Sequence, residues 1–264
     1  MSFVRSGAIG VAASIVIACV PLAAQTIVVT PSNPQGWAGT TYYGPGGTGS
    51  GTGAFGGITT AFPHSGNGSV EISLADAVNS EADWALTFAG GPYALSSLST
   101  LAYDWYRSST STVNAPGLMP AFALSMSDGS YLVYERAYNA TDDAPVDQWV
   151  TSNILNGTFW FTGNGSGSCG VYGAFQTLSK FNTQCFGGSG AVSGLDLFMG
   201  YAYEGSFRGA VDNVSYAFDT PDPTFNFEVD AGISTTPEPA TMSLMAFGLA
   251  GMAGAGIRRR KRSR

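Results

Sequence analysis

Along the central part of the chain, short apolar stretches alternate with polar turns, and strand signals recur roughly every 10–15 residues. In LSTLAYDWYR, the residues Leu101, Tyr103 and Trp105 occupy every second position, which places them on one face of a strand. The turn Ser127–Ser130 (SDGS) separates two more apolar stretches and predicts a hairpin. Because no part of this region sustains a helical period, the pattern predicts an all-β fold, an antiparallel jelly-roll-like β-sandwich.

Other expected elements complete the sandwich. The strand–turn–strand arrangement repeats around Asn156-Gly157, and two further strands flank Glu204–Ser206. A first strand is expected near Thr26–Thr30, ahead of a long glycine-rich surface loop, because glycine and proline oppose helix formation. The chain leaves the domain through a stretch punctuated by prolines, which has room for one last strand, Thr224–Val229.

The two ends of the chain depart from this pattern. Residues 1–24 combine Arg5, a continuous apolar run and a small-residue cleavage site, which indicates a secretory signal peptide with an apolar signal helix. An alternative interpretation is a lipoprotein box at Val16–Cys19. The expected organisation is a signal peptide over 1–24, a β-sandwich domain over 25–220, a spacer over 221–236 and a sorting or anchor segment over 237–264.

The C-terminal segment is typical of a membrane span. Ala240–Ile257 contains 18 uncharged, mostly apolar residues, and a helix of that length rises about 27 Å, enough to cross a hydrocarbon core. The basic cluster Arg258–Arg264 follows directly, and the positive-inside rule keeps such a cluster in the cytoplasm. The sequence therefore predicts a single transmembrane helix with the folded domain outside the cell.

Composition and charge narrow the function. Charged residues make up 11% of the chain and aromatic residues 12%, a composition typical of extracellular β proteins and not of disordered chains. Between residues 25 and 236, four basic residues stand against 17 acidic ones, a net charge of −13. Nucleic acid is excluded as a partner on this basis, because its binding needs cations. Neutral carbohydrate, calcium or no ligand remain compatible with the charge.

Two cysteines remain if Cys19 leaves with the signal peptide. Cys169 and Cys185 are expected to form a disulfide in an exported chain, and closing this loop would stabilise the fold by about 3 kcal/mol. The segment between them would be a tied-down loop or hairpin. Two free thiols are the alternative, and zinc is disfavoured because two cysteines and one distant histidine do not supply four ligands.

Aromatic side chains near predicted turns and strand ends are candidates for binding sugars, whose C–H faces stack on tryptophan and tyrosine rings. The residues selected on this basis are Trp149, Trp160, Tyr201 and Tyr203. The alternative is that these rings fill the core, where aromatic residues are common.

Candidate catalytic groups are few. His64 is the only histidine, and neither a G-x-S-x-G elbow nor an H-E-x-x-H motif occurs. Asp104 and Glu135 are the best candidates for the paired carboxylates of a glycoside hydrolase, although the favoured interpretation is that they are strand residues that face solvent. We therefore predict a non-enzymatic protein and keep a glycoside hydrolase as an alternative.

The stretch GAVDNVSYAF, residues 209–218, resembles the closing strand of carbohydrate-binding-module-like jelly rolls. The resemblance is short. It implies that Asp212 is a ligand of a structural calcium ion, which takes six to eight oxygen ligands. The remaining ligands are not identified by the sequence.

The last 28 or so residues closely resemble the PEP-CTERM sorting signal of Gram-negative bacteria, in which the motif, an apolar span and a basic cluster follow in order. The resemblance implies that an exosortase recognises Pro237, Glu238 and Pro239 and that the helix is a transient membrane anchor. A simple tail anchor is the alternative. The family implies an inner-membrane intermediate that ends on the cell surface or outside the cell.

Taken together, the sequence predicts an exported surface or extracellular-matrix protein with a structural or adhesive role, in contact with extracellular polysaccharide. A carbohydrate-binding module is the first alternative, and it predicts exposed rings along one sheet face or loop rim.

Overall fold

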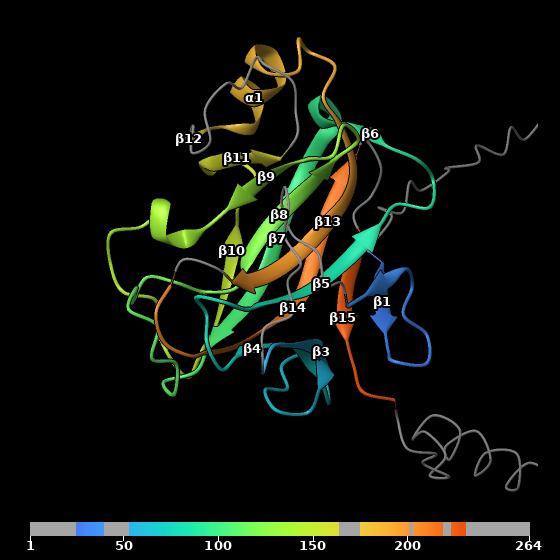
Figure 1. The fold of residues 1–264 in the computed structure, drawn as a ribbon. Helices are drawn as coiled ribbons and strands as arrows, with labels where there is room; N and C mark the ends of the chain where they lie inside the picture. The colour runs from blue at the N-terminus through green and yellow to red at the C-terminus, as the bar shows by residue number, and fades with distance from the viewer. Residues whose placement is uncertain (1–24, 40–52, 164–174, 201–202, 219–222, 231–264) are drawn as a thin grey trace, which may run out of the picture.

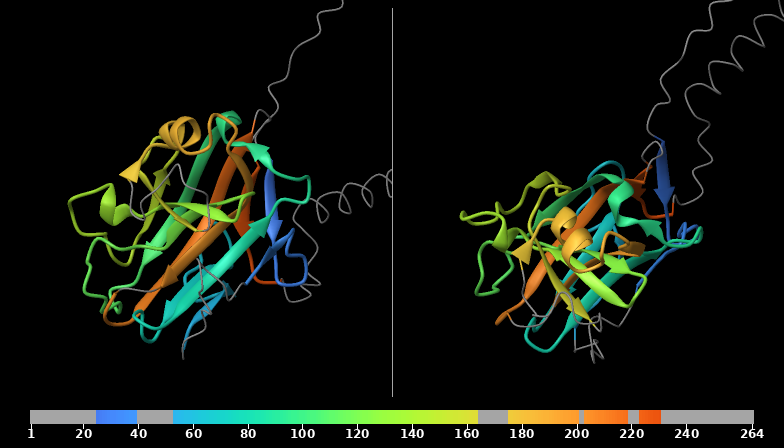
Figure 2. Two further views of the ribbon diagram at one scale, coloured as in Figure 1. Left: turned by 45° about the horizontal axis from the view of Figure 1, so that its top comes forward. Right: turned by 90° about the horizontal axis from the view of Figure 1, so that it is seen from above.

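The computed structural model describes residues 25–39, 53–163, 175–200, 203–218 and 223–230. Within these ranges almost all regular structure is β-strand. The strands form two sheets that pack face to face, and one α-helix lies at an end of the sandwich, near β11 and β12 (Figure 1, Figure 2). The predicted all-β sandwich is confirmed.

The first sheet is built around the long central strand β14. Its seven strands are β1 (Thr26–Val29), β3 (Phe55–Thr59), β4 (Ser69–Leu74), β7 (Leu98–Arg107), β10 (Trp149–Asn153), β14 (Phe207–Phe218) and β15 (Thr224–Phe227). One edge of β14 pairs with β7, which in turn pairs with β10, and the other edge pairs with β4 and β15. All of these pairs are antiparallel except β1 with β15, which is parallel.

The second sheet is entirely antiparallel and carries β13 near its centre. Its eight strands are β2 (Trp37–Ala38), β5 (Glu81–Thr87), β6 (Tyr93–Ala94), β8 (Ala121–Met126), β9 (Ser130–Tyr134), β11 (Phe159–Gly163), β12 (Phe175–Gln176) and β13 (Ala191–Gly200). The predicted hairpin at SDGS joins β8 to β9, and Gly129 takes the positive φ of 83° that this turn requires.

The core fills the space between the inner faces of the two sheets. Leu101, Tyr103 and Trp105 of β7 are fully buried there, as their alternation predicted. The polar atoms of the two large rings are satisfied, because the Tyr103 hydroxyl donates to the Pro120 carbonyl at 3.0 Å and Trp105 Nε1 donates to Ser152 Oγ at 2.9 Å. Because successive side chains of a strand alternate between the two faces, the residues between these buried positions point to the outer face of the sheet.

The segment around Asn156-Gly157 is a crossover and not the hairpin that the sequence suggested. Strand β10 pairs with β7 in the first sheet, whereas β11 pairs with β9 and β12 in the second. The turn therefore carries the chain from one layer to the other. Period-two alternation shows which face of a strand is buried, but it does not show which sheet the strand joins.

A short helix, α1 (Leu178–Gln184), stands where the sequence predicted a loop or hairpin between the cysteines, so that prediction was wrong. Thr177 caps its first turn by accepting from the Lys180 N–H, and Leu178 and Phe181 bury one face. With seven residues, the helix is too short to show a period in the sequence. Two 3₁₀ turns, η1 (Leu95–Ser97) and η2 (Arg136–Tyr138), complete the regular structure of the described ranges.

The ordered sandwich continues past residue 220, into the range expected to be a spacer. Strand β15 pairs with β14 and β1, in agreement with the last strand suggested near Thr224–Val229. The rings of Phe225 and Phe227 pack edge-on against Trp37, with centroid distances of 5.7 and 5.1 Å. Through these contacts β15 packs against the core, which explains why the sandwich includes this strand.

The predicted signal peptide and the predicted transmembrane helix lie outside the described residues. Among the helices that are described, none combines the length and the apolar character needed to cross a bilayer.

Candidate functional site

The two outer faces of the sandwich hold the polar groups that could serve a function, because the inner faces are apolar. The outer face of the second sheet carries an open groove with a volume of about 260 Å³ across β5, β13, β8 and β9. The residues that line this outer-face groove include Ala85, Thr87, Ser125, Tyr131, Gly194 and Asp196.

Strand register explains how these residues come together. Thr87 lies opposite Gly194, Gly194 opposite Ser125, and Ser125 opposite Tyr131, so that one row runs across four strands. With strands about 4.8 Å apart, the row spans about 14 Å from Thr87 to Tyr131. Its small side chains leave an open floor with a hydroxyl group on each side and a tyrosine ring at one end.

Gly194 keeps the floor of the groove flat. A Cβ atom at this position would lie 2.4 Å from the carbonyl oxygen of Leu86, closer than any side chain tolerates. The strand β13 also shifts register between Val192 and Gly194, where it forms a bulge. The bulge therefore requires glycine, and its absent side chain opens the middle of the row.

Buried carboxyl groups lie below and beside this groove. Asp196 occupies its floor and is only 3% exposed, with Oδ1 making no hydrogen bond. Glu81 and Asp83 follow on the same outer face of β5, and Glu81 is 2% exposed with neither carboxylate oxygen hydrogen-bonded. Such an arrangement disfavours the charged form of each group.

The pKa values follow from this burial. Desolvation, followed by the charge of Asp83, raises the pKa of Glu81 to about 8. Desolvation, followed by the charges of Asp83 and Glu81, raises the pKa of Asp196 well above its usual range. Glu81 is therefore largely protonated at neutral pH, and the Asp196 carboxyl, in its protonated form, can donate a hydrogen bond at the floor of the groove.

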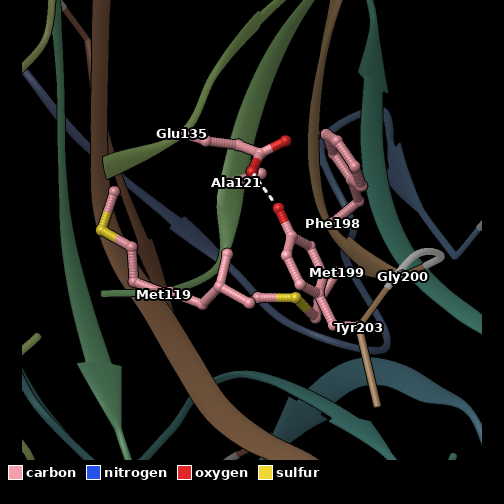
Figure 3. Close-up of a pocket in the computed structure, with 8 residues that line it drawn as sticks. Met119, Ala121, Glu135, Phe198, Met199, Gly200 and Tyr203 are labelled. Carbon is pink, nitrogen blue, oxygen red and sulfur yellow. Dashed lines mark hydrogen bonds between the residues drawn. The ribbon is translucent and has the colours of Figure 1, made fainter. Parts of the chain in front are cut away.

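Two of the four aromatic candidates meet on this same outer face. Trp160 Nε1 donates to Glu135 Oε1 at 3.0 Å, and the Tyr203 hydroxyl donates to Glu135 Oε2 at 2.9 Å. Figure 3 shows the Tyr203 hydroxyl directed at Glu135, with Phe198 beside the ring. Burial raises the pKa of Glu135, although the two donors oppose this shift.

The cavity beside Glu135 is very small, about 10 Å³, and Met119, Ala121, Phe198 and Met199 supply much of its wall (Figure 3). Trp160 packs in a cluster with Phe198 and is only 9% exposed. Its ring face is therefore not available for a sugar, which agrees with the alternative that this ring packs in the fold. Tyr201, the third candidate, lies outside the described residues.

Trp149 lies on the opposite face of the sandwich. It belongs to β10 in the first sheet, and its ring stacks on His64 with the centroids 4.3 Å apart. His64 Nε2 pairs with Asp104 Oδ2 at 2.9 Å, and Asn213 Nδ2 donates to the same oxygen at 2.8 Å. The cluster holds the loop that contains His64 against the outer face of the first sheet.

Asp212 extends this cluster inward and is fully buried. Its Oδ1 accepts the N–H groups of Asn213 at 2.8 Å and Phe227 at 3.0 Å, and its Oδ2 accepts the N–H of Ser65 at 3.1 Å. Within the described ranges, no group of three His, Cys, Asp or Glu residues is arranged to hold a metal ion. That Asp212 ligates calcium stays a prediction. Through the hydrogen bonds above, its carboxylate also joins three segments of the chain, at Ser65, Asn213 and Phe227.

Asp104 and Glu135, the carboxylate pair selected for hydrolysis, do not face each other. Asp104 lies on the outer face of the first sheet, and Glu135 lies on the outer face of the second. The packed core separates them, whereas a glycosidase pair must flank one sugar linkage. This pair therefore cannot act together, and His64 is engaged with Asp104 and Trp149.

Sequence reasoning missed Tyr131, Asp196, Glu81 and Thr87. One signal was present, because Glu81 and Asp83 alternate in an otherwise apolar stretch, which places two acids on one strand face. Cys185 lies at the end of α1, but Cys169 is outside the described residues, so the disulfide stays a prediction.

Comparison with protein families identifies the C-terminal segment. The model of the PEP-CTERM protein-sorting motif matches residues 235–261, which contain Pro237, Glu238 and Pro239. The chain thus carries the sorting motif that its sequence resembles, although the match covers only this segment. No curated protein matches the sequence.

Solved structures with similar architecture include two structures of a family 11 carbohydrate-binding module from Clostridium thermocellum. One, from the cellulase Lic26A-Cel5E, is 14% identical with a TM-score of 0.39, over 74% of this chain and 90% of that module. The other, in complex with a β-1,3-1,4-mixed-linked tetrasaccharide, is also 14% identical with a TM-score of 0.35, over 67% of this chain and 86% of that module.

A β-1,2-glucanase from Parabacteroides distasonis is 15% identical with a TM-score of 0.33, over 62% of this chain and 20% of the glucanase. The assignment of the fold rests on the strand pairing described above, and no ligand is carried over from these proteins.

Proposed function

We propose that this chain is an exported, non-catalytic surface protein that is processed through its PEP-CTERM motif and whose β-sandwich holds polysaccharide outside the cell, in a structural or adhesive role. The outer-face groove carries the proposal. It is the place among the described residues where an open floor, a tyrosine ring, two hydroxyl groups and an acid come together.

The chemistry of the groove suits a neutral glycan. The Tyr131 ring supplies an apolar face for the C–H side of a sugar, and Thr87 and Ser125 supply hydroxyl groups that both donate and accept. The Asp196 carboxyl, whose pKa is raised by burial, donates to a sugar hydroxyl while it is protonated. A pocket with a few placed polar groups is the usual form of a ligand site.

The charge of the protein argues against an anionic polymer. The net charge of −13 between residues 25 and 236 repels acidic polysaccharide and nucleic acid alike. An anionic ligand in the groove would also lie beside Glu81, Asp83 and Asp196, whose ionised forms would repel it. We therefore expect uncharged polysaccharides to bind best.

Replacement of Tyr131 by alanine should weaken polysaccharide binding about tenfold or more, because the ring at the end of the row is lost. The D196A variant should also bind more weakly, since it removes the donor at the groove floor. Migration of the purified protein in gels that contain β-glucan, xylan, galactomannan or an acidic polysaccharide measures the effect.

The matched control is Y106A, which removes a tyrosine from the outer face of the first sheet. It should bind as the wild type does, and W149A on the same face should behave likewise. Retardation of the wild type by none of the gels, or equal loss in Y131A and Y106A, contradicts the proposed site. A rise in reducing ends when the protein is incubated with a retarding polysaccharide contradicts the non-enzymatic assignment.

Alanine at Pro237, Glu238 and Pro239 together should abolish processing in a strain with an active exosortase. The two prolines hold this stretch extended and the glutamate supplies its only charge, so that the variant offers the enzyme neither feature. Mass spectrometry of the exported protein would find the C-terminal segment retained. Alanine at Thr235 and Thr236 is the control, and the same mature C-terminus in both variants refutes recognition of the motif.

A further inference from the structure

A second hollow adjoins the outer-face groove at the end of β5. It has a volume of about 260 Å³, and its walls include Gln35, Gly36, Phe88, Tyr93 and Tyr216. Thr87 and Leu86 border both this end pocket and the groove, so the two hollows lie next to each other at the end of β5. Thr87 between them is exposed.

The end pocket is built from interlocked aromatic rings. Phe88 contacts Tyr216 with centroids 5.1 Å apart and meets Tyr93 edge-on at 5.4 Å. Phe225 stacks on Tyr216 at 5.7 Å, with ring planes 9° apart. Each tyrosine ring is thus fixed by a neighbour, and Tyr93 remains 39% exposed. Rings held in this way offer apolar faces without an entropic cost of ordering them on binding.

Polar groups at the pocket complement these rings. The hydroxyl groups of Tyr93 and Tyr216 make no hydrogen bond to another described residue, and burial followed by the charge of Tyr93 raises the pKa of Tyr216 to about 12, so that its hydroxyl remains a donor. Gln35, at the pocket wall, is exposed and adopts a left-handed backbone with φ of 51°. Gln35 thus brings an amide-bearing residue to the pocket wall on a backbone that favours glycine.

We propose that the end pocket is a second glycan subsite and that the protein binds the interior of a linear, neutral polysaccharide, whose chain runs from the outer-face groove over Thr87 into this pocket. The inference rests on the proposed function and specifies the form of its ligand. Both hollows border Thr87, which argues for one occupant, and tyrosine rings with hydroxyl groups beside an amide fit sugar rings better than they fit an apolar peptide.

The proposal predicts that the affinity for an oligosaccharide depends on its length. A short oligosaccharide fills the outer-face groove alone, whereas a longer one also reaches Tyr93. Oligosaccharides from disaccharide to octasaccharide, cut from the polysaccharide that retards the wild type most, provide the probes. We expect affinity to rise steeply where the chain becomes long enough to pass Thr87, and to level off once both hollows are filled.

The Y93A variant should lose about tenfold in affinity for the octasaccharide and nothing for the shortest oligosaccharide that binds. Q35G should show a smaller loss on the long probe only, and its melting temperature should rise because glycine relieves the left-handed backbone. Calorimetric titration of the full exported protein measures both, with Y106A as the control.

Three outcomes are informative. Loss in Y93A that is equal for short and long oligosaccharides, or no loss for either, overturns the second subsite while Y131A still tests the groove. Loss confined to long oligosaccharides supports it. Absence of binding to every polysaccharide by the wild type overturns the proposed function together with this inference.

Discussion

Replacement of Asp212 by alanine should lower the free energy of unfolding by about 3–5 kcal/mol, because it leaves one buried and two partly buried N–H groups without an acceptor. The carboxylate is fully buried and joins the Ser65 loop, the turn of β14 at Asn213 and the exit strand at Phe227. Alanine removes the acceptor from the buried Phe227 N–H and from the partly buried N–H groups of Ser65 and Asn213 at once. Asn213 itself adopts a left-handed backbone with φ of 49°, which its bond to Asp212 helps to hold.

Urea unfolding followed by circular dichroism measures this loss. D76A is the matched control, because Asp76 accepts the Val78 N–H at 3.1 Å at an exposed position, where water can replace it. Its effect should stay below about 1 kcal/mol. A D212A variant as stable as D76A contradicts the structural role.

The same proteins test the calcium prediction. If Asp212 acts through the backbone alone, a chelator leaves the melting temperature of the wild type unchanged. If it ligates calcium, the chelator lowers the melting temperature of the wild type, and D212A no longer responds.

Replacement of Glu81 by glutamine should stabilise the protein at pH 8 by on the order of 3 kcal/mol and change little at pH 5. Burial raises the pKa of Glu81 from an ordinary value of 4.5 to about 8. Between these values the unfolded chain releases the proton while the folded protein keeps it. The free energy of unfolding therefore falls as the pH rises, by about 1.4 kcal/mol per pH unit for one such group.

Glutamine has the shape of the protonated side chain and does not titrate. In E81Q, the free energy of unfolding should therefore fall less steeply with pH than in the wild type. Urea unfolding at intervals from pH 5 to pH 8 gives the two profiles. E204Q makes the same change in charge at an exposed position and should run parallel to the wild type. Parallel profiles for E81Q and the wild type would show that Glu81 is not held in its protonated form.

The buried acids also bear on function. Protonation of Glu81 at neutral pH removes one negative charge from the outer face that carries the groove. A neutral glycan then meets hydroxyl and carboxyl donors in place of a fixed negative charge. Rising pH should weaken both folding and binding through the same groups, since ionised acids beside the groove lose their ability to donate.

The fold was predictable where a local pattern decided it. The alternation of Leu101, Tyr103 and Trp105 fixed the inner face of β7, and SDGS fixed the hairpin of β8 and β9. The partner of each strand was not predictable, because β10 and β11 follow each other in sequence and join different sheets. That choice depends on which inner faces fill the core together, which is a property of the whole chain.

The site was less predictable than the fold. Aromatic residues were identified by type and position near turns, and this reasoning found Trp160 and Tyr203 but could not show that Trp160 packs against Phe198. The groove depends on Thr87, Ser125, Tyr131 and Gly194, which are ordinary strand residues with no local motif. Only strand pairing brings them into one row, whereas the sorting motif is contiguous and could be identified from sequence alone.

Hydrogen exchange of the exported protein with and without a retarding polysaccharide tests the central claim most directly. If polysaccharide lies in the outer-face groove, protection should increase in β5, in β8 and β9 around Ser125–Tyr131, and in β13 around Gly194–Asp196, with β7 and β10 unchanged. Protection confined to β7, β10 and the loop at His64 would place the ligand on the opposite face and contradict the account.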